Sequence, residues 1–180
     1  VRHASPLRNL EATMSKPEIK IRRAEPSDAE AMRKIFESPK VIYGTLQLPF
    51  PSTENWRKRL AEPTDGAFNL IAFVNDEAVG QSGLYTFPHY PRRRHVGQIG
   101  MGVRDDWQGK GVGSALMQAM VDLADKWLNL SRLELEVYTD NEAAIHLYKK
   151  FGFVIEGTHY QFAYRDGHFI DVHAMARLRK

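Results

Sequence analysis

The sequence predicts an α/β domain in which helices flank a mixed β-sheet. Segments that alternate apolar and polar residues, as strands do, take turns along the chain with segments that have the 3.6-residue period of a helix. Two hairpin turns, Asn75-Asp76 and Asp166-Gly167, connect strands that follow one another directly. The composition supports a folded chain, because 43% hydrophobic and 26% charged residues are typical of globular proteins.

The expected strands are short runs bounded by turn residues. One of them, residues 95–103, is unusually rich in glycine. The strands cover 19–23, 68–74, 77–87, 95–103, 132–139 and two segments within 153–178.

Four helices are expected between these strands. The first follows a capping box formed by Ser27 and Glu30, and a short one covers 52–61. The longest covers about 110–128, and the last, within 141–152, ends at Gly152. The apolar stripe of the longest helix consists of Leu116, Met117, Met120, Leu123, Ala124 and Trp127.

Composition also limits location and chemistry. The chain has no apolar run of the ~18 residues that a membrane span needs and no signal peptide, so we expect a cytoplasmic protein. The absence of cysteine excludes disulfides, thiolate metal sites and a cysteine nucleophile. We expect residues 1–13 to be a tag or an extended start without stable structure, and residues 14–180 to form one domain.

The segment QGKGVGS, residues 108–114, places three glycines at the start of the longest helix. A Walker phosphate loop does not fit, because its first glycine would fall on Arg104. A dinucleotide fingerprint that starts at Gly109 meets Ser114 where glycine or alanine is needed. Glycines let backbone N–H groups approach an oxyanion at the positive end of a helix, so the turn suits a pyrophosphate. A tight turn that only needs positive φ is an equal alternative on this segment alone.

The next motif favours the first interpretation. Gln108-x-x-Gly111-x-Gly113, followed by YTDNEAAIHLYKKFGF, resembles the signature of the GNAT superfamily of N-acetyltransferases. The second half of the signature is matched at Asn141, Ala144, Leu147, Tyr148, Gly152 and Phe153. The resemblance runs from about residue 18 to the end of the chain. It implies a mostly antiparallel central sheet and acetyl-CoA as cosubstrate, held by Met101, Val103, Gln108, Gly109, Lys110, Gly111, Val112, Gly113, Ser114, Asn141 and Tyr148.

Tyr148 is the candidate general acid for the departing CoA thiolate, because the ordinary phenol pKa lies close to that of a thiol. The alternative is a core tyrosine on the helix stripe. Asn141 is an N-cap candidate, and in the family this asparagine lies near the pantetheine arm. In the family the strand of residues 95–103 also diverges from its neighbour through a bulge. A backbone N–H near Met101 is then the expected oxyanion donor, whereas a merely glycine-weakened strand would need no ligand.

The general base is open at this point. Gln98 occupies the strand position where many relatives carry a carboxylate, and an amide cannot accept the proton. Glu136 matches the glutamate base of the branch that acetylates ribosomal-protein N-termini. A structural role for Glu136 and proton loss to water are the alternatives.

Other polar clusters predict no further site. His168 lies on the opposite strand face from Asp171 and His173, so we expect no metal. Arg92, Arg93 and Arg94 are able to bind a carboxylate, but such a run is more often solvated surface, and no motif indicates nucleic acid binding.

The acceptor pocket is expected at residues 43–51, with Tyr43, Leu46, Leu48 and Phe50 as apolar walls or as simple packing residues. Together with the resemblance, this predicts acetyl transfer to the α-amine of a small molecule, a hydrophobic L-amino acid, by direct attack in a ternary complex. A protein N-terminal or lysine acetyltransferase and a non-catalytic CoA-binding sensor are the alternatives. The resemblance also suggests a homodimer.

Overall fold

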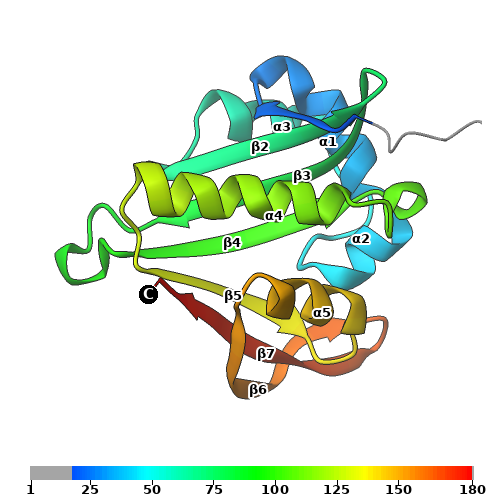
Figure 1. Cartoon of the computed structure of the whole chain (residues 1–180). Coiled ribbons are helices and arrows are strands. Elements are labelled where there is room, and N and C mark those ends of the chain that lie inside the picture. The colour runs from blue at the N-terminus through cyan, green and yellow to red at the C-terminus, as the bar shows by residue number, and fades with distance from the viewer. Residues whose placement is uncertain (1–17, 180) are drawn as a thin grey trace, which may run out of the picture.

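A seven-stranded β-sheet forms the centre of the molecule, in the strand order β1-β2-β3-β4-β5-β7-β6 (Figure 1). The computed structural model describes residues 18–179, and the expectation for residues 1–13 lies outside them. Neighbouring strands are antiparallel except β4 and β5, so the predicted mixed, mostly antiparallel sheet is confirmed. The strands are β1 (Lys20–Arg23), β2 (Ala67–Val74), β3 (Glu77–Thr86), β4 (Val96–Val103), β5 (Arg132–Tyr138), β6 (Val154–Arg165) and β7 (His168–Leu178).

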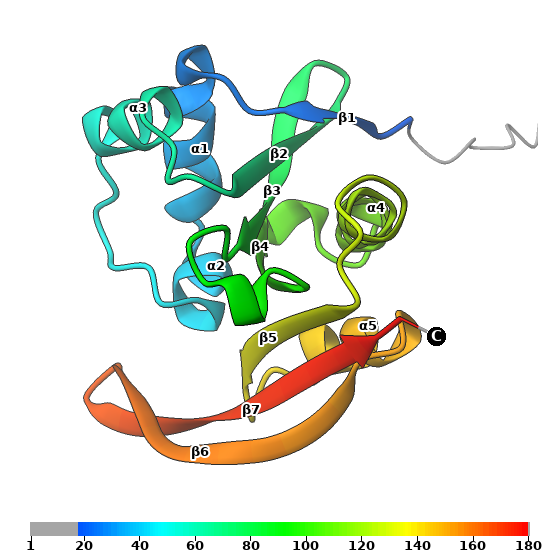
Figure 2. The same cartoon turned by 90° about the vertical axis from the view of Figure 1, so that its left-hand side faces the viewer.

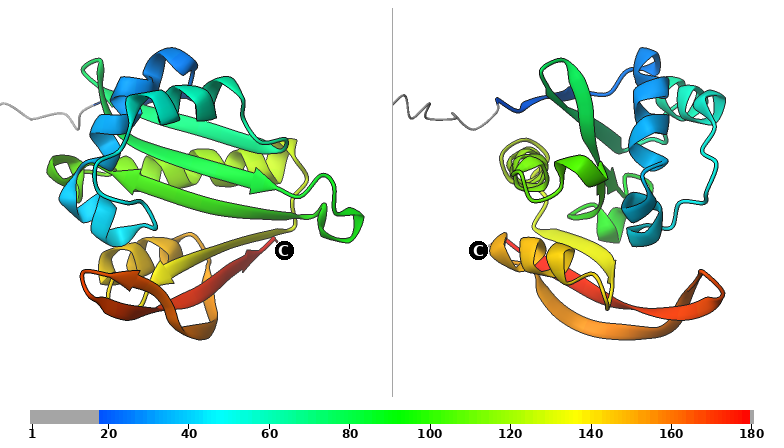
Figure 3. Two further views of the ribbon diagram at one scale, coloured as in Figure 1. Left: turned by 180° about the vertical axis from the view of Figure 1, so that it is seen from behind. Right: turned by 90° about the vertical axis from the view of Figure 1, so that its right-hand side faces the viewer.

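Helices cover both faces of the sheet (Figures 2 and 3). One face carries α1 (Ala29–Phe36), α2 (Pro39–Gly44) and α3 (Thr53–Ala61), and the other carries α4 (Val112–Asp122) and α5 (Glu142–Lys150). The sequence did not predict α2, because six residues are too few to display an amphipathic period. Among the helices of residues 18–179, none has the length and apolar character required to cross a membrane.

The first helix begins differently from the prediction. Pro26–Asp28 form a 3₁₀ turn before α1, and the Asp28 carboxylate accepts a hydrogen bond from the Glu25 N–H at 2.8 Å. The same carboxylate accepts two hydrogen bonds from Arg22 of β1, both at 2.7 Å. The predicted capping box starting at Ser27 is therefore wrong, because Ser27 already lies inside the turn and the cap begins at Glu25.

The long helix changes its winding after Asp122. Leu123–Trp127 form a π-helical turn, in which the Leu128 N–H donates to the Leu123 carbonyl at 3.0 Å. A π turn holds more residues per turn and so shifts the side chains that follow relative to an α-helix. Trp127 is 80% exposed as a result, and its assignment to the apolar stripe is wrong.

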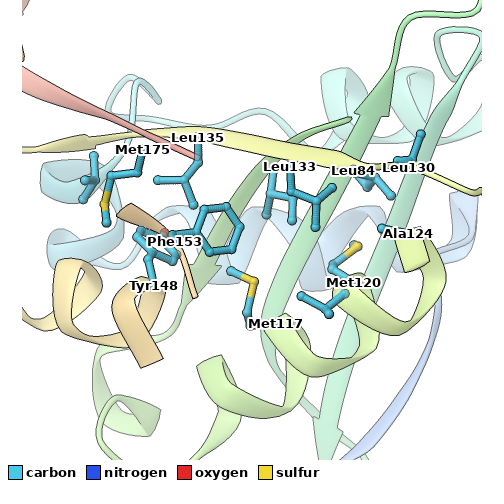
Figure 4. Packing of buried hydrophobic residues seen from close by; sticks show 13 residues of the cluster. Leu84, Met117, Met120, Ala124, Leu130, Leu133, Leu135, Tyr148, Phe153 and Met175 are labelled. Carbon is cyan, nitrogen blue, oxygen red and sulfur yellow. The ribbon is translucent and has the colours of Figure 1, made fainter. Parts of the chain in front are cut away.

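The largest apolar cluster lies between the sheet and helices α4 and α5 (Figure 4). It combines Met117 and Met120 of α4 with Leu84 of β3, Leu133 of β5 and Tyr148 of α5. The cluster therefore contains side chains from both sides of the β4–β5 boundary. Apolar burial on this face holds the two parts of the sheet together.

Strands β4 and β5 are paired over three residues only, from Val96 to Gln98 on β4. Beyond Gln98 the two strands separate, as Figure 1 shows, so the predicted divergence is confirmed. The register of β4 with β3 is uninterrupted from Gly97 to Val103, so no bulge against β3 accompanies the divergence. The sheet is thus open in its middle without being interrupted on the β3 side.

The different burial of two side chains on the long helix can be measured. Met120→Ala removes a fully buried side chain and should lower the free energy of unfolding by about 2–5 kcal/mol. Trp127→Ala removes an exposed side chain and should change it by less than about 0.5 kcal/mol. Urea unfolding of both variants provides the comparison. Similar losses for the two would contradict the exposed position of Trp127.

Candidate active site

A cavity of about 1230 Å³ lies where β4 separates from β5. Its lining includes Gly113 and Leu147 from the side of α4 and α5, and Gln98 and Tyr85 from the side of α1–α3. The cavity therefore passes through the separation from one face of the sheet to the other. A ligand in it can be held by the glycine turn at one end and by α3 at the other.

The glycine turn leaves several backbone N–H groups free at the start of α4. Gly111 is the N-cap, with φ of 88°, and Ala115 donates the first helical hydrogen bond to its carbonyl at 3.0 Å. The N–H groups of the intervening residues, Val112 to Ser114, therefore have no partner within the helix. They lie at the positive end of the helix dipole, next to the cavity. This arrangement is suited to binding an anion.

The turn also has room for a close ligand. A Cβ atom on Gly109, where φ is 73°, would meet no atom within 4 Å, and Gly109 lines the cavity together with Lys110, Gly111, Gly113 and Ser114. Val112 differs, because its side chain is buried in the apolar core. Only the backbone of Val112 is available for the binding role predicted for it.

Backbone groups of β4 point into the separation. The Arg104 N–H donates to the Val79 carbonyl of the strand β3 at 2.9 Å. Because backbone groups of successive residues in a strand point to opposite edges, those of Val103 and Met101 point away from β3. On that side β5 has already separated, so these groups face the cavity that both residues line.

Gln108 and Asn141 have identified hydrogen-bond partners. The Gln108 side-chain amide donates to the Val103 carbonyl at 3.0 Å and so fixes the entry of the glycine turn to the end of β4. Asn141 is the N-cap of α5 as predicted, with its Oδ1 accepting from the Ala144 N–H at 3.2 Å. Both side chains line the cavity.

Tyr148 lines the cavity while its ring is largely buried against Phe153, at 6.0 Å between ring centroids. Burial raises the pKa of Tyr148 to about 12. The phenol therefore holds its proton more tightly than the ordinary tyrosine assumed in the sequence analysis. At neutral pH it is a hydrogen-bond donor and not a base.

Glu136, the candidate base, lines the cavity. Gln98, which occupies the position where many relatives carry a carboxylate, lines it as well. Glu136 is exposed to it, and among the described residues no basic side chain forms an ion pair with this carboxylate. Glu134, two residues earlier on the same strand face, is instead paired with Arg132 and Arg93. Glu136 is thus the carboxylate of this face that is left to interact with a ligand.

The structure brings only part of the predicted acceptor wall to the cavity. Leu46 lines it, but Phe50 is 97% exposed and, like Leu48, is not among the lining residues. Tyr43 lies in a second, adjoining pocket of about 460 Å³. The predicted role of Phe50 as a pocket residue therefore finds no support, because the chain turns outward there with a positive φ of 63°.

Sequence reasoning missed most of the apolar wall. Trp56 of α3 stacks on Phe36 of α1 at 4.7 Å between ring centroids, and both line the cavity. Leu60, one turn after Trp56, also lines the cavity, and Phe162 of β6 adds apolar surface from the β5–β7 part of the sheet. The i, i+4 spacing of Trp56 and Leu60 identifies the inner face of α3, but only the fold places that face over the cavity.

An arginine from β6 joins the two sides of the separation. Arg165 lies over the Tyr43 ring, 3.8 Å from its centroid, and 4.9 Å from the centroid of the Tyr138 ring. It donates to the Tyr43 carbonyl at 2.9 Å and forms an ion pair with Asp140. The Tyr138 hydroxyl donates to the Thr45 carbonyl at 3.2 Å. We call these contacts the Arg165 clamp, because they fasten the end of α2 to the β5–β7 part of the sheet.

The remaining polar clusters lie outside the cavity. Within residues 18–179, no group of three or more His, Asp and Glu side chains is placed to hold a metal ion. The His173 Nδ1 is 2.9 Å from the Thr158 hydroxyl, and Asp171 accepts from the Gln161 N–H at 2.7 Å. Arg93 pairs with Glu134, and the Arg94 Nε donates to the Pro88 carbonyl at 3.3 Å.

Comparisons with known proteins indicate one family. The model of the acetyltransferase (GNAT) family matches residues 29–153. The chain is 43% identical over 162 residues to the L-amino acid N-acetyltransferase AaaT of Escherichia coli K12, which covers 90% of this chain and 99% of that protein. A GNAT acetyltransferase structure from Streptococcus pneumoniae is 32% identical, with a TM-score of 0.78 over 91% of this chain and 100% of that one. The structure of a putative acetyltransferase from Salmonella typhimurium, solved with its cofactor acetyl-CoA, is 21% identical, with a TM-score of 0.75. The match covers 89% of this chain and 93% of that one, and at this identity it supports the fold alone.

Proposed function

Because the chain belongs to the acetyltransferase (GNAT) family, we propose that it transfers the acetyl group of acetyl-CoA to the α-amine of a hydrophobic L-amino acid. One observation carries the proposal: the glycine turn and the helix of Asn141 and Tyr148, which bear the two halves of the signature, line the same cavity. The similarity to the E. coli L-amino acid N-acetyltransferase over nearly the full length of both chains supports the acceptor class.

The glycine turn fits the pyrophosphate of acetyl-CoA. Its N–H groups supply donors at the start of α4, and the open space beside Gly109 leaves room for phosphate oxygens. Lys110, whose Nζ lies 4.8 Å from the centroid of the Trp107 ring, adds a positive charge to the same turn. Toward the separation, Met101, Val103 and Asn141 provide polar groups for the pantetheine arm.

Three groups of the chain have roles in the proposed reaction. When bound, acetyl-CoA supplies the acetyl group as a thioester. The Met101 N–H, free on the β5 side, donates to the acyl oxygen as negative charge develops there. Tyr148 donates its proton toward the departing sulfur, and Glu136 accepts a proton from the acceptor amine. The amine attacks directly, since the chain has no cysteine to carry an acyl group.

The acceptor end of the cavity suits a small apolar molecule. Trp56, Leu60, Leu46 and Phe162 provide apolar surface, and burying an amino-acid side chain there contributes about 25 cal/mol per Å² of apolar area. A protein substrate would need an open groove instead, and a non-catalytic CoA sensor would need neither Tyr148 nor Glu136 in the cavity. Both alternatives predict a different outcome in the acceptor assay below.

The acceptor class is tested by thiol release from acetyl-CoA with a panel of acceptors. L-Phenylalanine or L-methionine should have a higher kcat/KM than L-lysine, spermidine or peptides, because only their side chains gain apolar burial at this end. A preference for spermidine or for peptide N-termini would refute the amino-acid acceptor. If no acceptor in the panel causes thiol release, the sensor alternative remains.

Binding of acetyl-CoA at the glycine turn is tested with two matched alanine variants. Gly109 and Gly167 both have positive φ, 73° and 80°, and open space where a Cβ would lie, but only Gly109 lines the cavity. Each substitution should lower stability by about 1–2 kcal/mol through backbone strain. Only Gly109→Ala should also reduce the rise in melting temperature caused by acetyl-CoA. Equal ligand shifts in the two variants would make the turn purely structural.

Tyr148→Phe removes one hydroxyl and keeps the ring in the core. We expect kcat to fall about 10- to 100-fold with little change in the thermal shift by acetyl-CoA. Because the phenol pKa is about 12, loss of the acid should not reduce wild-type activity below about pH 11. Tyr160→Phe, at an exposed position of β6, is the control. Unchanged turnover in Tyr148→Phe would exclude it as the acid.

Glu136→Gln tests the proposed base through a pH profile of kcat/KM. The loss of activity should be largest near pH 7, where the amine is mostly protonated, and should shrink as the pH rises. Glu134→Gln, on the same strand face but outside the cavity, should show no such pH dependence. An equal loss at every pH in Glu136→Gln would indicate a structural role, and no loss would leave water as the proton acceptor.

A further inference from the structure

A basic side chain of the acceptor end has no role in the reaction described above. Arg59 lies in the last turn of α3 and lines the cavity, with its guanidinium carbon 5.2 Å from the centroid of the Trp56 ring. Among the described residues it forms no ion pair, although other arginines of the chain, such as Arg33 and Arg57, are paired with glutamates. Glu62, three residues further, also lines the cavity and does not pair with Arg59.

Two further hydrogen-bond donors, the Tyr85 hydroxyl and the Asn69 amide, line the same cavity as Arg59. The Tyr85 hydroxyl is 2.9 Å from the position that a Cβ on Gly83 would occupy, so the ring folds over this glycine. Burial raises the pKa of Tyr85, and the positive charge of Arg59 partly opposes this effect, as expected for neighbouring groups. Asn69 lies on β2, directly opposite Gly83 of β3. Its side-chain oxygen accepts a hydrogen bond from the Gln81 amide at 3.2 Å, so the NH₂ group of Asn69 is left as a donor.

The positive charge of Arg59 and the carboxylate of Glu136 lie on different sides of the cavity, and the carboxylate of Glu62 lines it near the end of α3. Arg59 lies on the side of β2 and β3, and the carboxylate of Glu136 lies on β5, across the separation. Gly100 of β4, between these sides, has open space where a Cβ would lie, whereas the Tyr85 ring covers its pairing partner Gly83 on β3. A molecule with a carboxylate and an ammonium group matches this distribution of charge.

We propose that Arg59 binds the α-carboxylate of the acceptor, together with the Tyr85 hydroxyl and the Asn69 amide, and thereby selects free amino acids. The inference rests on the proposed function. A carboxylate and an α-amine are attached to the same carbon, so their separation is shorter than the strand spacing of about 4.8 Å. A carboxylate held by the Tyr85 hydroxyl on β3 thus allows the amine to lie toward β4, over the open space at Gly100.

The arrangement also accounts for discrimination between amines. A polyamine brings a second positive charge toward Arg59, which is unfavourable, and it offers no carboxylate to this group. Arginine binds carboxylates in a bidentate geometry that lysine does not reproduce. The proposed three donors therefore recognise the part of the acceptor that all free α-amino acids share, while Trp56 and Leu60 contact the variable side chain.

The test compares two acceptors that differ only at the carboxylate. L-Phenylalanine and L-phenylalaninamide have the same side chain and α-amine, and the amide lacks the negative charge. Arg59→Gln should lower kcat/KM for L-phenylalanine about 10- to 100-fold, mainly through KM, because a hydrogen bond to a charged group is lost. The same variant should change kcat/KM for L-phenylalaninamide by less than about 3-fold. Its thermal shift with acetyl-CoA should equal that of the wild type.

Lys58→Gln is the matched control, since it removes a positive charge from the same helix at a position that does not line the cavity. It should leave both acceptors unaffected. An equal loss on both acceptors in Arg59→Gln, or a loss on neither, would overturn the role of Arg59. If the wild-type enzyme acetylates L-phenylalaninamide but not L-phenylalanine, the role of Arg59 is also overturned, although acetyl transfer itself is then demonstrated. Failure of the wild type with every hydrophobic amino acid in the panel would instead refute the proposed function.

Discussion

The short pairing of β4 with β5 is the constraint on which the site depends. Only three residue pairs join the strands, and beyond Gln98 the edge of β4 faces a cavity and not a neighbouring strand. Backbone N–H groups without a partner are unfavourable in a closed core, so an opening of this kind is stable only if water or a ligand satisfies them. The same opening makes the Met101 N–H available to an acyl oxygen. The short β4–β5 pairing therefore accounts both for the cavity and for the free N–H group that faces it.

Apolar packing compensates for the missing strand pairing on one face only. The cluster that includes Met117, Leu133 and Tyr148 crosses the boundary beneath α4 and α5 and keeps the two parts of the sheet in fixed relation. On the opposite face the residues that line the cavity at this boundary include Gln98, Gly100 and Glu136, which are small or polar. This division explains why Tyr148 is both a core residue and a cavity residue: its ring stabilises the junction, while its position at the boundary leads to the site.

Features determined by neighbouring residues could be predicted from the sequence, and features determined by packing could not. The hairpins at Asn75 and Asp166, the glycine turn and the N-cap at Asn141 depend on local geometry, and the structure contains them. Trp127 was misplaced, because a π turn is not visible in an apolar period. Arg59 was overlooked and Phe50 was overvalued, since only the fold decides which side of α3 and of its preceding loop meets the cavity. The resemblance indicated the glycine turn as the donor end of the cavity, but it did not define the acceptor end.

The Arg165 clamp connects the two parts of the molecule that lie on either side of the β4–β5 separation. It connects α2, which packs over β1–β4, to the β5–β7 part of the sheet. These contacts resist any movement of the two parts away from each other. Moving α2 away from this part of the sheet would break the contacts of Arg165 with the Tyr43 ring and carbonyl and the Tyr138–Thr45 hydrogen bond, and the cation–π pair alone contributes about 0.5–2 kcal/mol. The fixed position of α2 relative to β5 therefore depends on a side chain that does not itself line the main cavity.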